Sequence, residues 1–274
     1  MSVTAMLTGS EAPDEIAVKQ ALSLATRLQV PLVGLCALPD PSSALLYTTS
    51  PYMIGVGGAA MDSVYAAQNE VVAGAREMFE RVTAGAEGAR FEHQTELTER
   101  AAVDAATLSD VIVFPRPAGR ASHPLARAFE HVLMDAGLPV YLSGEKLAES
   151  GPVVVARDGS PQVARAVRMQ ERLIRMAGTV VVAQNPEDLG DREGRRAASV
   201  DALGNWLKHR GVNVETAEFK GDVADGLCQI AKDRSAQMVV AGAYGHSRAG
   251  EFLFGGATRG LLRAEDAPAL ALVH

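Results

Sequence analysis

The chain is a succession of short apolar runs, each followed by a stretch in which apolar residues recur every three or four positions. A short apolar run is typical of a buried strand, and the longer period is typical of a helix with one buried face. Strands alternating with helices predict βαβ units, and hence an α/β fold with mostly parallel, doubly wound sheets. The expected strands cover residues 3–7, 31–35, 91–97, 111–114, 139–142, 153–156, 179–183, 212–217, 238–241 and 268–273.

Turn-forming residues separate the predicted helices from the strands. Ser160 is expected to cap a helix, with Pro161 in its first position. Residues 41–63, rich in Ser, Gly and Tyr, are expected to be an insertion. Within it, residues 55–60 mimic a dinucleotide fingerprint but follow no core strand, so a loop is predicted. The expected helices cover residues 17–28, 65–82, 101–108, 129–133, 163–177, 200–207, 223–231 and a segment from 259.

The order of elements occurs twice along the chain. Gly9-Ser10 in the first half answers Gly159-Ser160 in the second, and residues 109–113 answer residues 236–240. The sequence therefore predicts two similar domains, at 1–146 and 151–274, with the linker at 146–151 and the insertion 41–63 in the first.

Composition narrows the classes of function. A chain of 274 residues that is 47% hydrophobic can form two full cores. A formal charge of −7 disfavours nucleic-acid and anionic-membrane surfaces, which select basic patches. No apolar run is long enough for a bilayer and the first residues lack a signal peptide's basic segment, so a cytoplasmic location is expected. Cys36 and Cys228 have no metal-ligand spacing and are expected to be small buried side chains.

The strongest chemical pattern is the glycine-rich segment 242–258. It follows an apolar run and precedes a predicted helix, an arrangement that offers backbone N–H groups to an anion. Gly242, Gly245 and Gly255 allow a phosphate to approach the backbone closely. The same glycines could instead form tight turns without a ligand, but their position between strand and helix favours a phosphate site.

The spacing Gly-x2-Gly-x9-Gly, with Thr258 close behind, resembles the nucleotide loop of the universal stress protein family. The chain looks like a tandem, two-domain member, with a specific motif in the second half alone. The resemblance implies an adenine nucleotide alpha hydrolase-like, Rossmann-like fold with strand order 3-2-1-4-5 in each domain. It also implies that the domains pair about a pseudo-twofold axis, with residues 140–142 antiparallel to 269–273, and that a homodimer can form.

The resemblance further implies a site for ATP, ADP or AMP in the second domain. Asp158 would contact the nucleoside, a group near Gln184 the base, and the glycine loop the phosphates. From the residues alone, Asp158 could equally complete a helix cap, Arg248 could be a solvated arginine, and His246 fits a solvent-facing loop better than a catalytic base. The candidate nucleotide-binding residues are Ala156, Asp158, Gln184, Gly242, Gly245, His246, Arg248, Gly255, Gly256, Ala257 and Thr258.

Two departures from the family pattern modify this expectation. Thr8 stands where the second half has Asp158, and the loop 115–120 contains two prolines, which lack N–H donors. The first domain is therefore expected to have lost nucleotide binding. Gly256 occupies a position where the family usually has Ser or Thr, so binding of a triphosphate is expected to be weaker than is usual in the family.

The expected function is a regulatory stress-response module that binds an adenine nucleotide. The alternative is an interaction protein with both sites empty, acting through protein–protein contacts. Catalysis beyond weak ATP hydrolysis is not expected, because the loop has no lysine and no pair of carboxylates to hold Mg²⁺. The sequence also lacks a P-loop motif. It therefore predicts no catalytic residue and no resident metal.

Overall fold

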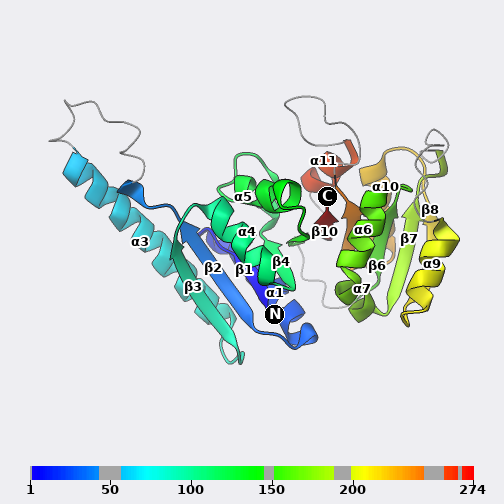
Figure 1. The fold of residues 1–274 in the computed structure, drawn as a ribbon, viewed down its shortest axis with the longest axis horizontal. Helices are drawn as coiled ribbons and strands as arrows, with labels where there is room; N and C mark the ends of the chain where they lie inside the picture. Colours follow the sequence, from blue (N-terminus) through cyan, green and yellow to red (C-terminus); the bar gives the residue numbers. More distant parts are fainter. Residues whose placement is uncertain (1, 43–56, 145–150, 188–198, 244–255, 265–266) are drawn as a thin grey trace.

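The computed structural model describes residues 2–42, 57–144, 151–187, 199–243, 256–264 and 267–274. Its centre is one ten-stranded sheet with the order β3-β2-β1-β4-β5-β10-β9-β6-β7-β8 (Figure 1). Within each half the order is 3-2-1-4-5, and the expected α/β fold is confirmed. The strands are β1 (Val3–Met6), β2 (Leu32–Leu38), β3 (Ala89–Thr95), β4 (Val111–Phe114), β5 (Val140–Leu142), β6 (Val153–Arg157), β7 (Thr179–Gln184), β8 (Asn213–Glu218), β9 (Met238–Gly242) and β10 (Ala269–Val273).

The two halves meet at the only antiparallel pair among these strands. Tyr141 of β5 lies opposite Ala271 of β10, with Leu142 opposite Leu270. Both strands are buried along their length. The pairing that was expected between 140–142 and 269–273 is present, and it covers two strand edges that would otherwise be open to association. The two predicted sheets are therefore one continuous sheet.

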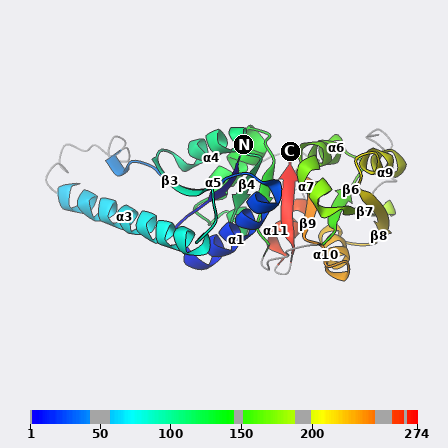
Figure 2. The ribbon, with the colours of Figure 1, turned by 90° about the horizontal axis from the view of Figure 1, so that it is seen from below.

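Helices cover both faces of the sheet. One core layer lies under α1, α3, α6, α7 and α9, and the other under α4, α5, η3, α10 and α11; each layer runs through both halves. Figure 2 shows α1 and α3 on one side of the first-half strands and α4 on the other. The helices are α1 (Glu11–Leu28), α3 (Gly57–Val82), α4 (Thr98–Leu108), α5 (Ala126–Glu130), α6 (Pro161–Met169), α7 (Glu171–Ala177), α9 (Val200–Lys208), α10 (Val223–Asp233) and α11 (Gly256–Arg263), with the 3-10 helix η2 (Arg116–Gly119) and the π-helix η3 (His131–Asp135).

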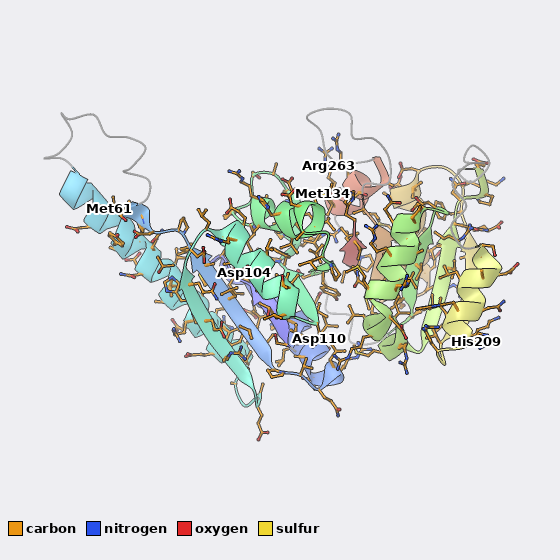
Figure 3. All side chains as sticks on the ribbon, viewed as in Figure 1. Met61, Asp104, Asp110, Met134, His209 and Arg263 are labelled. Atoms are coloured by element: carbon orange, nitrogen blue, oxygen red, sulfur yellow. The ribbon has the colours of Figure 1, made fainter. Side chains whose placement is uncertain are left out.

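Helix α3 differs from the prediction. It begins at Gly57, so the loop that was predicted for residues 57–60 is wrong and residues 57–63 of the insertion are helical. Ala and Met are frequent from residue 59 onward, and these strong helix formers outweigh the two glycines at the start. The helix extends beyond the edge of the sheet, with Met61 on the projecting part (Figures 1 and 3). Residues 43–56 of the insertion and most of the linker, 145–150, lie outside the described residues.

Three smaller points complete the fold. The single helix expected at 163–177 is divided into α6 and α7, with Gln170 between them. Cys36 is a buried free thiol and Cys228 a half-buried one, and burial raises the pKa of both. Within the described ranges, no helix is both long and apolar enough to cross a membrane.

Candidate functional site

A pocket lies where the carboxyl ends of β6 and β9 meet. Strand β6 is paired on one side with β7 and on the other with β9, so chain connections leave this point in opposite directions. Such a switch point is where open parallel sheets bind ligands. The volume of the pocket is about 70 Å³, which is below the range typical of pockets that bury a whole small molecule.

The lining of the pocket has an apolar wall and a smaller polar part. The strand ends contribute Ala156, Ala183 and Ala241, and the helices contribute Val163, Val223, Leu227 and Leu261. Polar lining comes from Arg157, Asp158, Asn185 and Thr258. Phe219 adds an aromatic ring, which lies so close to α10 that a Cβ on Gly226 would be 2.2 Å from the Cδ2 of Phe219.

Asp158 lies in the turn that leads into α6, at the edge of the pocket. Its Oδ1 accepts a hydrogen bond from the backbone N–H of Ser160 at 2.8 Å, and Ser160 Oγ in turn accepts from Val163 N at 3.3 Å and caps α6. Pro161 occupies the first turn, as predicted. Asp158 therefore shapes the turn and also lines the pocket.

Three side chains at the ends of adjacent strands form a hydrogen-bonded row. Arg157 Nη1 donates to Gln184 Oε1 at 2.9 Å, and Gln184 Nε2 donates to Glu218 Oε1 at 3.1 Å. The strand register places these residues side by side on one face of the sheet. Burial lowers the pKa of Arg157, and the charge of Asp158 opposes that shift. The row thus holds the guanidinium beside the pocket.

The residue after Gln184 lines the pocket, whereas Gln184 itself lies beside it. Asn185 is buried; its Nδ2 donates to Gly221 O at 3.1 Å and its Oδ1 accepts from Glu187 N at 3.0 Å. The amide therefore ties together the chain segments that follow β7 and β8. Sequence reasoning missed Asn185 and, apart from Ala156, the apolar wall. Their position at the carboxyl ends of predicted strands was the available signal.

The glycine-rich segment is described at its two ends. Gly242 lines the pocket, and a Cβ there would lie 2.9 Å from the backbone N of Val163, so this glycine is also needed for β9 to pack on α6. Ala257 and Thr258 line the pocket from the first turn of α11, and Thr258 is buried. Gly256 is exposed at the start of that helix. The candidates Gly245, His246, Arg248 and Gly255 lie outside the described residues.

The corresponding turn of the first half is closed on itself. Asp14 of α1 is fully buried, and its Oδ2 accepts from Thr8 N at 2.7 Å and Gly9 N at 2.9 Å, while the Thr8 hydroxyl donates to Oδ1 at 3.2 Å. A Cβ on Gly9 would be 2.8 Å from Val71 Cγ1 of α3. Burial raises the pKa of Asp14 to about 6, although these hydrogen bonds lower it. Sequence reasoning missed Asp14.

No metal-binding arrangement is found in the described part of the chain: no three His, Cys, Asp or Glu side chains gather there. The residues that could hold a cofactor at the pocket are Asp158, Thr258, the backbone at the start of α11 and the apolar wall. This set can donate and accept hydrogen bonds and can enclose a flat apolar group. Such a set suits binding and orientation of a ligand.

Comparison with known proteins places the pocket in a recognised domain. Residues 150–272 match the sequence model of the Universal stress protein family, so the second half contains a domain of that type. Over the whole chain, a universal stress protein from Archaeoglobus fulgidus DSM 4304 has a similar structure, with a TM-score of 0.67, 14% identity, and coverage of 99% of this chain and 97% of that one. A functionally unknown protein from Pseudomonas aeruginosa PAO1 aligns with a TM-score of 0.54 and 14% identity, over 99% of this chain and 92% of that one. At these identities the likeness is one of fold. No curated protein matches the sequence.

Proposed function

We propose that the second half binds an adenine nucleotide (ATP, ADP or AMP) and that the chain acts as a regulatory stress-response module. The observation that carries this proposal is the convergence of Asp158, Gly242 and the first turn of α11 on one pocket. The family match over residues 150–272 supports it. The first half is proposed not to bind a nucleotide, because Asp14 already uses the amides of its turn.

Each part of the pocket would bind a different part of the nucleotide. The apolar wall with Phe219 would enclose the base, and the Asp158 carboxylate would accept a hydrogen bond from the ribose. The first N–H groups of α11 have no partner within the helix and can bind a phosphate, assisted by the Thr258 hydroxyl. The Arg157 guanidinium, held in place by Gln184, would put a positive charge near the ligand.

We propose a binding role without efficient turnover. Phosphoryl transfer requires cationic groups, a metal and an oriented nucleophile. The segment 242–258 contains neither a lysine nor a pair of carboxylates. A rapid steady-state release of phosphate from ATP by the purified chain, with or without added Mg²⁺, would overturn this part of the proposal.

Titration calorimetry with ATP, ADP and AMP tests the proposed function. We expect at most one site per chain. Asp158→Ala should weaken binding by about tenfold, because it removes a charged hydrogen-bond acceptor from the site. Asp104→Ala, which makes the same charge change on an exposed position of α4 (Figure 3), is the control and should bind like the wild type. Two equal sites, or full affinity in Asp158→Ala, would contradict the assignment.

The alternative function gives a different result in the same experiment. An interaction protein with empty sites would show no heat with any adenine nucleotide. Mass spectrometry of small molecules retained by the purified chain would then find none at a stoichiometric level. That pair of results would favour action through protein–protein contacts.

A further inference from the structure

An arginine of the first half binds the end of α11, a helix of the second half that lines the pocket. Strand β4 is followed by η2, whose first residue, Arg116, is only 8% exposed. Its backbone N–H donates to Ser143 Oγ at 3.0 Å, just after β5, which fixes it to the first half. Its guanidinium donates to Leu261 O at 2.5 Å and to Pro268 O at 3.2 Å, with Ala264 O at 3.4 Å.

Two of these acceptors lie in or just beyond the last turn of α11. The last carbonyl groups of a helix have no partner within it, and a cation is favourable at that end of the helix dipole. The fork of an arginine can bind several carbonyl oxygens at once. Arg116 therefore supplies the partners that the end of α11 lacks.

A second contact at the same place holds α11 close to η2. A Cβ on Gly119 would lie only 2.8 Å from Leu262 Cδ2, so the two helices approach closely here. Arg263, the last residue of α11, is labelled in Figure 3. The opposite end of α11 carries Ala257 and Thr258, and Leu261 both accepts from Arg116 and lines the pocket.

We propose that Arg116 is a positioning residue, through which the first half sets the position of α11 and thereby the affinity of the second-half pocket. The loop 115–120, which was expected only to have lost nucleotide binding, would in this arrangement position α11. The proposal rests on the proposed function for its effect on nucleotide binding. Coupling is reciprocal, so a ligand that orders α11 also strengthens the contact between the halves.

A matched pair of arginines makes the test specific. Arg27 of α1 also crosses between the halves: its Nη1 donates to Gln237 Oε1 at 2.7 Å and its Nη2 to Met176 O at 3.1 Å. Gln237 precedes β9, so this contact is at the other end of that strand from the pocket. Arg27→Gln removes a contact between the halves without touching α11.

Calorimetry with ADP compares the full-length variants. Arg116→Gln is expected to weaken binding by about tenfold, and Arg116→Lys by less, because an ammonium keeps the charge but not the fork. Arg27→Gln should leave the affinity within about twofold of the wild type. If Arg27→Gln and Arg116→Gln lost the same amount of affinity for ADP, the cause would be a general weakening of the contact between the halves, and the proposal would be overturned.

Hydrogen exchange of the α11 amides, measured without ligand, separates this inference from the proposed function. The α11 amides should exchange faster in Arg116→Gln than in the wild type, whereas in Arg27→Gln they should exchange at the wild-type rate. If wild type binds no nucleotide but this exchange pattern is found, the proposed function fails and the positioning role stands. Unchanged exchange in Arg116→Gln overturns the inference. If Arg116→Gln does not fold, Arg116→Lys is judged by the same two measurements.

Discussion

The turns after the first strand of each half share a backbone plan but differ in their chemistry. Gly9 and Gly159 both have positive φ, 81° and 74°. In the second half the carboxylate, Asp158, precedes the glycine and lines a pocket. In the first half the carboxylate, Asp14, comes from the helix and accepts hydrogen bonds from the turn itself. The comparison teaches that the position of one carboxylate along the chain decides whether it lines a pocket or is buried beneath the turn, where it accepts hydrogen bonds from two backbone amides.

The packing of the two halves differs at an equivalent strand position. Gly34 pairs with Ala5 of β1, and Val182 pairs with Val155, the corresponding residue of β6. Phe79 of α3 packs directly on Gly34. Helix α3 has 26 residues, whereas α9, which stands at the same place in the element order of the second half, has 9. A glycine thus lets a larger helix pack closely in the first half.

The largest effect should come from breaking this close packing with Gly34→Ala. The added methyl would lie 2.4 Å from Phe79 Cδ2, and Phe79 is only 1% exposed, so its ring cannot swing into solvent. We expect urea unfolding to show a loss of about 3 kcal/mol in the free energy of unfolding. The control is Gly74→Ala on α3, where nothing lies within 4 Å; it should raise stability by up to about 1 kcal/mol through helix propensity. Wild-type stability in Gly34→Ala would contradict the described packing.

The second effect concerns the buried carboxylate of the first half. Burial raises the pKa of Asp14 to about 6, while an unfolded chain loses this proton near pH 4, at about the ordinary pKa. The stabilising contribution of the protonated group is therefore fully present below about pH 4 and is lost as the pH rises through about 6. Relative to Asp14→Asn, which does not titrate, the wild type should lose on the order of 2 kcal/mol of unfolding free energy between pH 4 and 7. Urea unfolding of both proteins across this range measures the loss; a wild type that keeps or gains stability relative to Asp14→Asn as the pH rises would be evidence against the buried carboxylate.

The smallest effect should come from restoring the hydroxyl that the second half lacks. A Cβ on Gly256 would have nothing within 4 Å, so a serine fits there. If the start of α11 binds a phosphate, Gly256→Ser adds one neutral hydrogen bond and should tighten ATP binding several-fold, on the order of 1 kcal/mol. Gly256→Ala controls for the change in helix propensity. Equal affinities for ATP in the two variants would discredit the phosphate position.

The sequence predicted the strands well, because most are short apolar runs and strand order followed from the family resemblance. Strands β3 and β8, at the two ends of the sheet, instead alternate between more and less exposed residues. The prediction failed at the start of α3, where Gly57 and the Ser and Gly around it suggested a loop although the composition from residue 59 favours a helix. The described lining of the pocket includes five of the candidates: Ala156, Asp158, Gly242, Ala257 and Thr258. Their roles in nucleotide binding stay predictions.

The features that the sequence did not predict depend on contacts between residues far apart in the chain. The row of Arg157, Gln184 and Glu218 exists because the register of three strands aligns these residues. A sequence motif does not show how neighbouring strands are aligned. Arg116 could not be connected to Leu261 from sequence, because 145 positions separate them. Domain boundaries at 1–146 and 151–274 stay predictions, and the two core layers run without interruption through both halves.

The seam between β5 and β10 sets an order of events during translation. Strand β5 emerges from the ribosome long before β10, its antiparallel partner, because the whole of β6 to β9 lies between them in the chain. Until then the nascent first half has an apolar strand edge with unpaired backbone groups, which is the kind of surface that chaperones protect. The ten-stranded sheet can be completed only after residues 269–273 have emerged. If translation stalled before that point, β5 would stay an unpaired edge strand, which is prone to associate with other chains.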